Sequence, residues 1–263
     1  METNLSRRGF LTGAAAAGAL AAMGLAGCAP TPAAEGSTKT AETGTAATSW
    51  RDKPEMPTEF VETVDADIVV VGAGNGGLVA ATTAAQNGAK VVVLEKAGAI
   101  AAAREAIGAL NSKLAPDHQE DVPTLLNHAN QTQSGDANML MYKTWAEKSG
   151  EMIEWMADTL GPKGMLFPFE WHCPDDPHAY YPAMCYNPCI GEYNPDGPNY
   201  NSYAHLEVMR DVFTDDLGGE IRFECPAQQL VIDESGRVTG VVAEGKEGFI
   251  QVNAAKGVII CTG

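Results

Sequence analysis

The hydrophobic positions between residues 67 and 95 follow the pattern of a strand, a helix and a second strand. Residues 67–71 and 90–94 are short β-branched apolar runs, as expected for strands that are buried on both faces. Residues 78–87 form an Ala-rich stretch that predicts a helix, and Gly88 stands where a helix C-cap is expected. This order predicts one βαβ unit.

The middle of the chain is less regular. Residues 120–161 show helical periodicity, with Asp136 as a predicted cap and a stripe of Met, Tyr and Trp that we interpret as core. Residues 165–203 are rich in Pro, Tyr and Asn without periodicity, which predicts a long loop. Residues 202–217 predict a further helix, which ends at Gly218 and Gly219.

After residue 220 the chain has the pattern of successive short strands. These predicted strands are residues 221–225, 229–232, 238–243 and 249–252, with a turn at residues 233–236. Residues 257–261 then predict a buried strand, which Thr262 and Gly263 follow. The pattern predicts a β-meander that leads into one more strand of a sheet.

The first predicted turn has the spacing G-x-G-x-x-G, in the order Gly72, Ala73, Gly74, Asn75, Gly76 and Gly77. In such a unit the first glycine allows the tight turn, the second lets a pyrophosphate approach the backbone, and the third lets helix and strand pack closely. The helix N-terminus offers N–H groups and the positive end of its dipole to the phosphates. Glu95, at the end of the second predicted strand, is placed to accept hydrogen bonds from a ribose diol. The unit predicts a dinucleotide site.

The composition excludes some partners. The chain has 263 residues, is 45% hydrophobic, and carries a formal charge of −17, from 34 acidic and 17 basic residues. Nucleic acids and anionic lipids need clustered Lys and Arg, so this balance argues against both as partners.

The first sixty residues predict an export signal and a tether. Residues 6–11 (Ser-Arg-Arg-Gly-Phe-Leu) resemble the twin-arginine signature, and an uncharged Ala- and Gly-rich stretch follows, so residues 1–27 are a predicted signal peptide. A retained membrane-spanning helix is the alternative. Residues 25–28 (Leu-Ala-Gly-Cys) resemble a lipobox, which predicts lipidation of Cys28; an ordinary cleavage site is the alternative. Residues 28–60 are a predicted disordered linker. The expected location is the cell envelope, either periplasmic or lipid-anchored at the outer face of the membrane.

Two motifs at the ends of the folded region resemble a known family. The opening Asp-Ile-Val-Val-Val-Gly of residues 67–72 and the closing Val-Ile-Ile-Cys-Thr-Gly of residues 258–263 resemble the FAD-binding domain of the fumarate reductase and succinate dehydrogenase flavoproteins. The resemblance implies a Rossmann-like α/β domain of the glutathione-reductase type, with a central parallel sheet and a β-meander. This domain would span residues 61–263, with a helical and loop insertion at about residues 113–217.

The resemblance also implies the cofactor and its contacts. The expected cofactor is FAD, and the expected contacts are Gly72, Ala73, Gly74, Asn75, Gly76, Gly77, Glu95, Lys96, Thr262 and Gly263. Ala227 corresponds to a position that touches the adenine end in the family, with an ordinary strand residue as the alternative.

The sequence departs from the family pattern in two places. The family shows Gly-Gly-Asn-Ser or Gly-Gly-Thr-Ser soon after the Glu-Lys pair, whereas here an Ala-rich, predicted helical stretch of residues 97–109 intervenes, and Ile107, Gly108 and Ala109 are expected to line the flavin. The chain also has about half the length of a complete family member, so we expect a domain that is truncated before the capping domain. The substrate-binding Arg and His of the family come later, and no catalytic residue is assigned.

The predicted loop of residues 165–203 contains His172, Cys173, His178, Cys185 and Cys189. Zinc sites commonly use Cys-x-x-Cys pairs, and this loop has none, so we predict no metal site. Its expected place is near the flavin, where His172 or His178 would assist a substrate carboxylate; a structural role is the alternative.

The predicted function is an exported FAD-dependent oxidoreductase that reduces the double bond of a small unsaturated acid or enone by hydride transfer from flavin N5. Its electrons would come from an external donor protein or a quinol. A 3-ketosteroid dehydrogenase-like flavoenzyme shares the same architecture. The sequence also fits a truncated or non-catalytic flavin-binding lipoprotein that carries electrons. An NAD-dependent enzyme would share the βαβ unit, but the meander argues against it.

Overall fold

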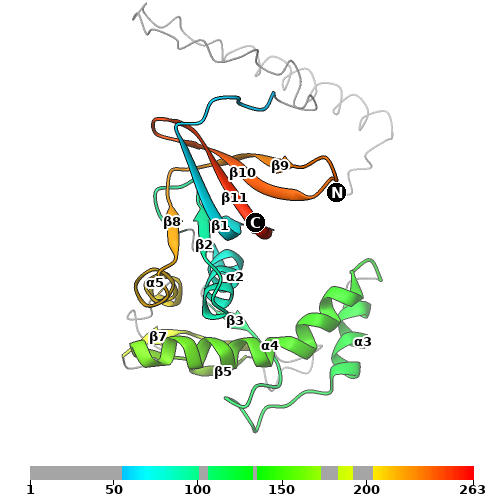
Figure 1. Cartoon of the computed structure of the whole chain (residues 1–263). Coiled ribbons are helices and arrows are strands. Elements are labelled where there is room, and N and C mark those ends of the chain that lie inside the picture. Colours follow the sequence, from blue (N-terminus) through cyan, green and yellow to red (C-terminus); the bar gives the residue numbers. More distant parts are fainter. Residues whose placement is uncertain (1–54, 101–105, 133–134, 173–182, 192–203) are drawn as a thin grey trace, which may run out of the picture. The chain divides into compact units, whose positions relative to one another are not determined.

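The computed structural model describes residues 55–100, 106–132, 135–172, 183–191 and 204–263 (Figure 1). The predicted signal peptide, Cys28 and nearly all of the predicted linker therefore lie outside the described residues. Residues 56–263 form one unit by their contacts. Within the part of the chain that the structure describes, no helix is long and apolar enough to cross a membrane.

A six-stranded mixed sheet forms the centre of this unit, in the order β8-β2-β1-β11-β10-β9. Four neighbouring strands are parallel, namely β8 (Glu220–Arg222), β2 (Val91–Leu94), β1 (Glu62–Val71) and β11 (Gly248–Ile260). The antiparallel strands β10 (Val238–Gly245) and β9 (Ala227–Ile232) extend the sheet beyond β11. Figure 1 shows the long strands β1 and β11 side by side. The predicted α/β fold, with parallel strands and a meander, is confirmed.

Strand β2 and the end of β1 next to the glycine-rich turn are buried on both faces, because their side chains alternate between two cores. One core holds Val69, Val71, Val92 and Leu94 together with the meander residues Val241, Ile250 and Val252. The other core holds Val70, Val91 and Val93 together with Ala81 of helix α2 (Asn75–Gln86) and Phe213. Each such side chain stabilises the fold by about 1.5–3 kcal/mol when it is fully buried. A polar residue would therefore be costly at any of these core positions. The predicted burial of residues 257–261 is wrong, since Ile259 and Ile260 of β11 are 37% and 58% exposed.

Two strand predictions near the C-terminus are wrong. Residues 221–225 were expected to begin the meander, but β8 joins the parallel edge of the sheet, where Arg222 pairs with Leu94. Residues 249–252 and 257–261 were expected to be separate strands, whereas β11 is continuous. β1 supplies backbone partners along nearly all of β11, with an irregularity between Ala66 and Ile68, so pairing continues through the polar positions that suggested a break.

An insertion of helices and short strands lies between β2 and β8. Its elements are β3 (Ile107–Gly108), α3 (Val122–Thr132), α4 (Met139–Leu160), the 3₁₀ turn η2 (Gly161–Lys163), β4 (Met165–Leu166), β5 (Phe169–His172), β6 (Ala183–Tyr186), β7 (Cys189–Ile190), α5 (Ala204–Asp211) and the π-helical turn η3 (Val212–Asp216). Strands β3, β6 and β5 form a small sheet, and β4 pairs with β7. A shared core joins Leu78 of α2, Ile153 of α4 and Met209 of α5, so the insertion packs on the outer side of α2.

The structure corrects the predictions for α4. Asn138, rather than Asp136, caps this helix, because its side-chain oxygen accepts hydrogen bonds from the N–H groups of Leu140 and Met141. The core interpretation of the Met and aromatic stripe is confirmed for Met156 and Leu160, which are buried. It is wrong for Trp145, whose exposed fraction is 36%.

Two further segments differ from the sequence predictions. The described residues of the stretch 97–109 are not helical, because Ile107 and Gly108 pair with Tyr186 and Cys185 as strand β3. The segment 165–203 was expected to be a loop, but it contains the four short strands β4, β5, β6 and β7. In both segments, pairing with distant residues decides the local conformation, and local periodicity does not report such pairing.

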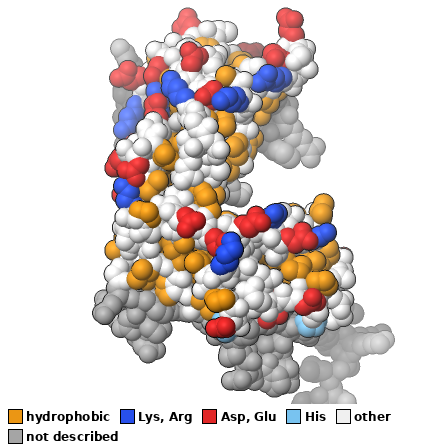
Figure 2. Space-filling model, turned by 60° about the horizontal axis from the view of Figure 1, so that its bottom comes forward, with side chains coloured by type: hydrophobic (Ala, Val, Ile, Leu, Met, Phe, Trp, Pro, Cys, Tyr) orange, Lys and Arg blue, Asp and Glu red, His pale blue; other side chains and the backbone are white. Residues whose placement is uncertain are grey.

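Charged side chains on the surface are largely interspersed. On the face drawn in Figure 2, Lys and Arg side chains lie among Asp and Glu side chains. Arg222 contacts Glu62 and Glu220, and Lys246 lies 2.6 Å from Glu224. Exposed pairs of this kind contribute about 0–1 kcal/mol each. Their main consequence is that the positive charges are locally balanced.

Candidate cofactor site

The glycine-rich turn connects the carboxyl end of β1 to the start of α2. Gly72 has a φ of +104°, in the left-handed region that favours glycine, and its N–H group donates to the carbonyl of Leu94 at 2.8 Å. Gly74 is the N-cap of α2, and the N–H group of Leu78 donates to its carbonyl at 2.9 Å. The N–H groups of the three residues between them precede this first helical bond. They are the donors that a helix N-terminus offers to a phosphate group.

Two glycines of this turn are required by the approach of other backbone segments. A Cβ atom on Gly72 would lie 2.4 Å from the carbonyl oxygen of Cys261. A Cβ atom on Gly77 would lie 1.9 Å from the carbonyl oxygen of Gly72, which is well inside contact distance. Gly76 differs, because its Cβ would approach only the sulfur of Cys261, at 4.0 Å. The predicted packing roles of the first and third glycines therefore have a direct geometric basis.

Glu95 is buried at the carboxyl end of β2, with an exposed fraction of 4%. Its Oε2 atom accepts a hydrogen bond from the N–H group of Ala73 at 2.7 Å, and its Oε1 atom accepts one from Ala97 at 2.8 Å. Hydrogen bonds to an ionised carboxylate are roughly twice as strong as neutral ones. Glu95 thus holds the glycine-rich turn against the end of β2. A contact with the ribose stays a prediction. It is compatible with these two hydrogen bonds, because each carboxylate oxygen has a second lone pair that can accept another one.

The remaining predicted contacts lie in or directly after strands β2, β9 and β11. The N–H group of Cys261 donates to the carbonyl of Val71 at 2.8 Å, which brings Cys261 and Thr262 beside Gly72, and Gly263 follows them in the chain. Lys96 is exposed next to Glu95. Ala227 begins β9, two residues after Cys225, whose N–H group donates to the carbonyl of Glu95 at 2.9 Å. The opening and closing motifs therefore meet at the carboxyl ends of β1 and β11, although they are almost 200 residues apart in the sequence.

Two thiols lie near the turn. Burial raises the pKa of the Cys261 thiol, and it also raises the pKa of the Cys225 thiol. A thiol needs a lowered pKa to act as a nucleophile at neutral pH. The direction of both shifts therefore argues against a nucleophilic role of these thiols.

Sequence reasoning missed one polar residue at this site. His205 of α5 has an exposed fraction of 2%, and its Nε2 atom lies 3.1 Å from Oδ1 of Asn75, the first residue of α2. A histidine in an apolar helical pattern gives no sign of its partner. Only the packing of α5 on α2 brings the two side chains together.

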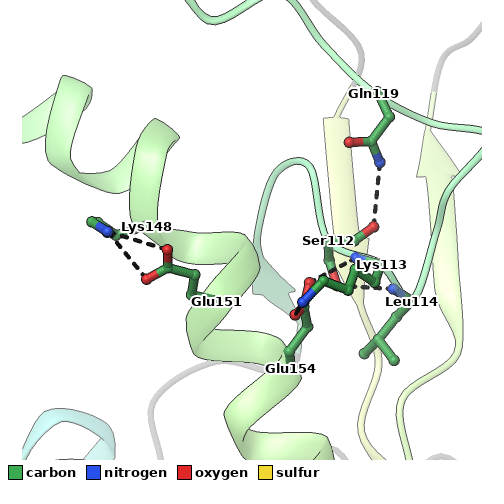
Figure 3. Close-up of polar contacts among 7 residues, drawn as sticks. All are labelled: Ser112, Lys113, Leu114, Gln119, Lys148, Glu151 and Glu154. Carbon is green, nitrogen blue, oxygen red and sulfur yellow. Dashed lines mark hydrogen bonds and ion pairs between the residues drawn. The ribbon is translucent and has the colours of Figure 1, made fainter.

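The segment of residues 107–112, part of which was expected to line the flavin, is held by α4. Nε1 of Trp145 donates to the carbonyl of Gly108 at 3.1 Å, and the N–H group of Leu110 donates to Oγ of Ser149 at 2.9 Å. Figure 3 shows the continuation of this contact, where Lys113 meets Glu154 through both its N–H group and its Nζ atom. The expected flavin contact stays a prediction, but the segment has a rigid support.

Substitution of Gly150 tests whether α4 packs closely against residues 107–112. A Cβ atom on Gly150 would lie 2.4 Å from the carbonyl oxygen of Leu110, so Gly150→Ala should lower the free energy of unfolding by about 1–3 kcal/mol through overpacking. The matched control is Gly161→Ala, because Gly161 has helical backbone angles and open space around its Cβ. This control should raise stability by about 0.4–1 kcal/mol. Equal effects in denaturant unfolding would contradict the close approach of α4.

The metal prediction concerns residues that are only partly described. Among the described ranges, no group of three or more His, Cys, Asp and Glu residues is placed to hold a metal ion. Cys173 and His178 lie outside these ranges, and of His172 only the backbone is described. A role of His172 or His178 in substrate binding therefore stays a prediction.

The sheet order, the glycine-rich turn and the buried acid at the end of β2 define a Rossmann-type dinucleotide-binding domain. Residues 67–263 match the family described as FAD binding domain, and the chain belongs to this family. FAD is accordingly its cofactor. Glycines at the close contacts and donors at the start of α2 fit such a dinucleotide. The family resemblance is confirmed at the level of this domain.

Similar proteins include several flavoenzymes. The chain is 30% identical to the digoxin reductase of Eggerthella lenta over an alignment that covers 99% of this chain and 46% of that protein. The structure of 3-ketosteroid-Δ4-(5α)-dehydrogenase from Rhodococcus jostii RHA1 matches with a TM-score of 0.64 and 23% identity, over 78% of this chain and 47% of that one. A flavocytochrome c3 fumarate reductase matches with a TM-score of 0.58 and 20% identity, over 78% of this chain and 34% of that one. The chain thus spans less than half the length of these proteins, and the structural matches show a shared fold.

Proposed function

We propose that this chain belongs to an FAD-dependent reductase that acts on a carbon–carbon double bond conjugated to a carboxylate or a ketone. The observation that carries the proposal is the 30% identity to a digoxin reductase, which extends over 99% of the chain. The shared fold with a fumarate reductase and a ketosteroid dehydrogenase supports the same substrate class, which is a small unsaturated carboxylate or an enone.

The residues of this chain would bind and orient the cofactor. When bound, FAD supplies two electrons as a hydride for the double bond. The first-turn N–H groups of α2 would bind the pyrophosphate, and Glu95 would keep the turn in place while it accepts hydrogen bonds from the ribose. The electrons would reach the flavin from an external donor protein or a membrane quinol. The acid that protonates the substrate is not assigned to any residue of this chain.

We further propose that the protein is exported in folded form and attached to the membrane through Cys28. The support is the twin-arginine-like sequence of residues 6–11 and the lipobox-like sequence of residues 25–28. An intact mass measured on the protein from its own cells should correspond to a chain that begins at Cys28 and carries lipid. A mass that retains residues 1–27 would contradict this proposal.

One alternative function has specific structural support, and a second would need only the bound cofactor. Oxidation of a saturated ketosteroid, the reverse direction, is favoured by the TM-score of 0.64 to a ketosteroid dehydrogenase. A non-catalytic electron carrier would need only a bound FAD with an accessible flavin edge.

A single anaerobic assay separates these functions. The full chain, loaded with FAD and reduced with dithionite, is mixed with fumarate or with 4-androstene-3,17-dione, and the visible flavin absorbance is followed. We expect one of the two acceptors to restore the oxidised spectrum and to gain two hydrogen atoms by mass spectrometry, faster than with equally reduced free FAD. Failure of both acceptors with FAD still bound would favour the carrier. Reduction of the oxidised flavin by a saturated ketosteroid would favour the dehydrogenase.

A further inference from the structure

The insertion contacts the start of α2, next to the glycine-rich turn, through the buried side chain of His205. His205 is almost fully buried on α5, whereas Asn75, with which it forms a hydrogen bond of 3.1 Å, is exposed at the start of α2. The imidazole is held by packing, because its neighbours Leu206 and Met209 share a core with Leu78 of α2. The buried ring of His205 thus forms a hydrogen bond with the exposed side chain of Asn75.

The orientation of the Asn75 amide matters for an anionic ligand. Asn75 lies among the backbone donors that precede the first helical bond of α2, from Leu78 to Gly74. The two ends of an amide differ, because its oxygen only accepts hydrogen bonds and its nitrogen only donates. An oxygen directed at a phosphate would repel it, whereas an NH₂ group would bind it.

In the structure the oxygen end of the Asn75 amide faces the imidazole, with Oδ1 3.1 Å from Nε2 of His205. With Oδ1 of Asn75 on Nε2 of His205, the ring nitrogen carries the proton and donates, and the amide oxygen is turned toward α5. The NH₂ end of Asn75 then points away from His205. Because an amide oxygen only accepts hydrogen bonds, this orientation of Asn75 assigns the donor role to Nε2 of His205.

We propose that His205 is a positioning residue for the pyrophosphate of FAD. It keeps the Asn75 oxygen away from the phosphates, and α5 thereby contributes to cofactor affinity without touching the cofactor. The proposal concerns FAD binding alone, and it holds whichever substrate the protein reduces.

Binding of FAD and of ADP to the full chain tests this role, since ADP carries the pyrophosphate without the flavin. His205→Ala should weaken both ligands about tenfold, which corresponds to about 1.4 kcal/mol. His205→Gln should stay within about threefold of the parent, because its amide NH₂ replaces the Nε2 donor. In a double-mutant cycle, Asn75→Ala should add little to the loss that His205→Ala has already caused.

A matched packing variant separates positioning from general destabilisation. Met156→Ala removes a buried side chain of α4, away from His205 in the sequence, and should lower the free energy of unfolding while FAD affinity stays within about threefold. Equal losses of FAD affinity in Met156→Ala and His205→Ala, or no rescue by His205→Gln, would overturn the proposal. If His205→Ala fails to fold, Asn75→Ala changes only an exposed side chain. Unchanged FAD and ADP affinity in that variant would also overturn it.

Discussion

Replacement of Gly77 by alanine is expected to reduce FAD affinity about a hundredfold or more, which corresponds to at least about 2.7 kcal/mol. The reason is the contact of 1.9 Å that the new Cβ would make with the carbonyl oxygen of Gly72. Both groups belong to the turn that presents the phosphate donors, so the start of α2 must move away from β1. The affinity is measured by titration of the full apoprotein with FAD, followed by flavin fluorescence.

Gly76→Ala is the matched control for this prediction. It adds the same methyl group one residue earlier in the same turn, where the nearest neighbour is the Cys261 sulfur at 4.0 Å. We expect this variant to bind FAD within about threefold of the parent, because a contact at this distance is ordinary van der Waals packing. Similar FAD affinities for the Gly77→Ala and Gly76→Ala variants would show that the close packing of helix and strand does not control cofactor binding.

Replacement of Glu95 by glutamine is expected to lower the free energy of unfolding by about 2–4 kcal/mol. The carboxylate accepts hydrogen bonds from Ala73 and Ala97 through its two oxygens, whereas glutamine has only one oxygen and would turn an NH₂ group toward the other N–H donor. A buried donor without an acceptor costs about 1–3 kcal/mol. FAD affinity should fall about tenfold at the same time, because the turn loses its support at the end of β2.

The exposed Glu247, in the turn between β10 and β11, provides the control. Glu247→Gln makes the same chemical change without a buried hydrogen bond, and we expect its free energy of unfolding to stay within about 0.5 kcal/mol of the parent. Both variants are compared by denaturant unfolding of the apoprotein. A Glu95→Gln variant that is as stable as Glu247→Gln would argue that Glu95 serves the ribose alone.

Much of the cofactor domain was predictable from local patterns. The strands around residues 67–71 and 90–94, the glycine spacing and Glu95 lie within 30 residues of one another, and each has a short-range physical reason. The closing motif of residues 258–263 could be assigned because it begins with a continuous apolar run, although Ile259 and Ile260 are exposed in the structure rather than buried. FAD as the cofactor was implied by the resemblance of these motifs and the meander to the flavoprotein family.

Other features depended on contacts between distant residues. The edge position of β8 and the continuity of β11 come from pairing with β2 and β1. The helix predicted over residues 97–109 is overridden where Ile107 and Gly108 pair with β6. The preference of an Ala-rich stretch for helix is a weak term that such pairing outweighs. Similarly, the side chain of Trp145 forms a hydrogen bond with the carbonyl of Gly108 and is not buried in the core.

The sequence by itself therefore determined the class of domain and the order of strand, glycine-rich turn and helix, because these depend on backbone conformation and on short-range burial. The cofactor was implied by the resemblance to a flavoprotein family. Only the tertiary structure decided that Glu95 holds the turn through Ala73 and that Cys261 closes over Gly72. It also decided that His205 reaches Asn75 across 130 residues. These contacts arise where separate elements pack together, and packing depends on the shape of the whole core rather than on any local pattern.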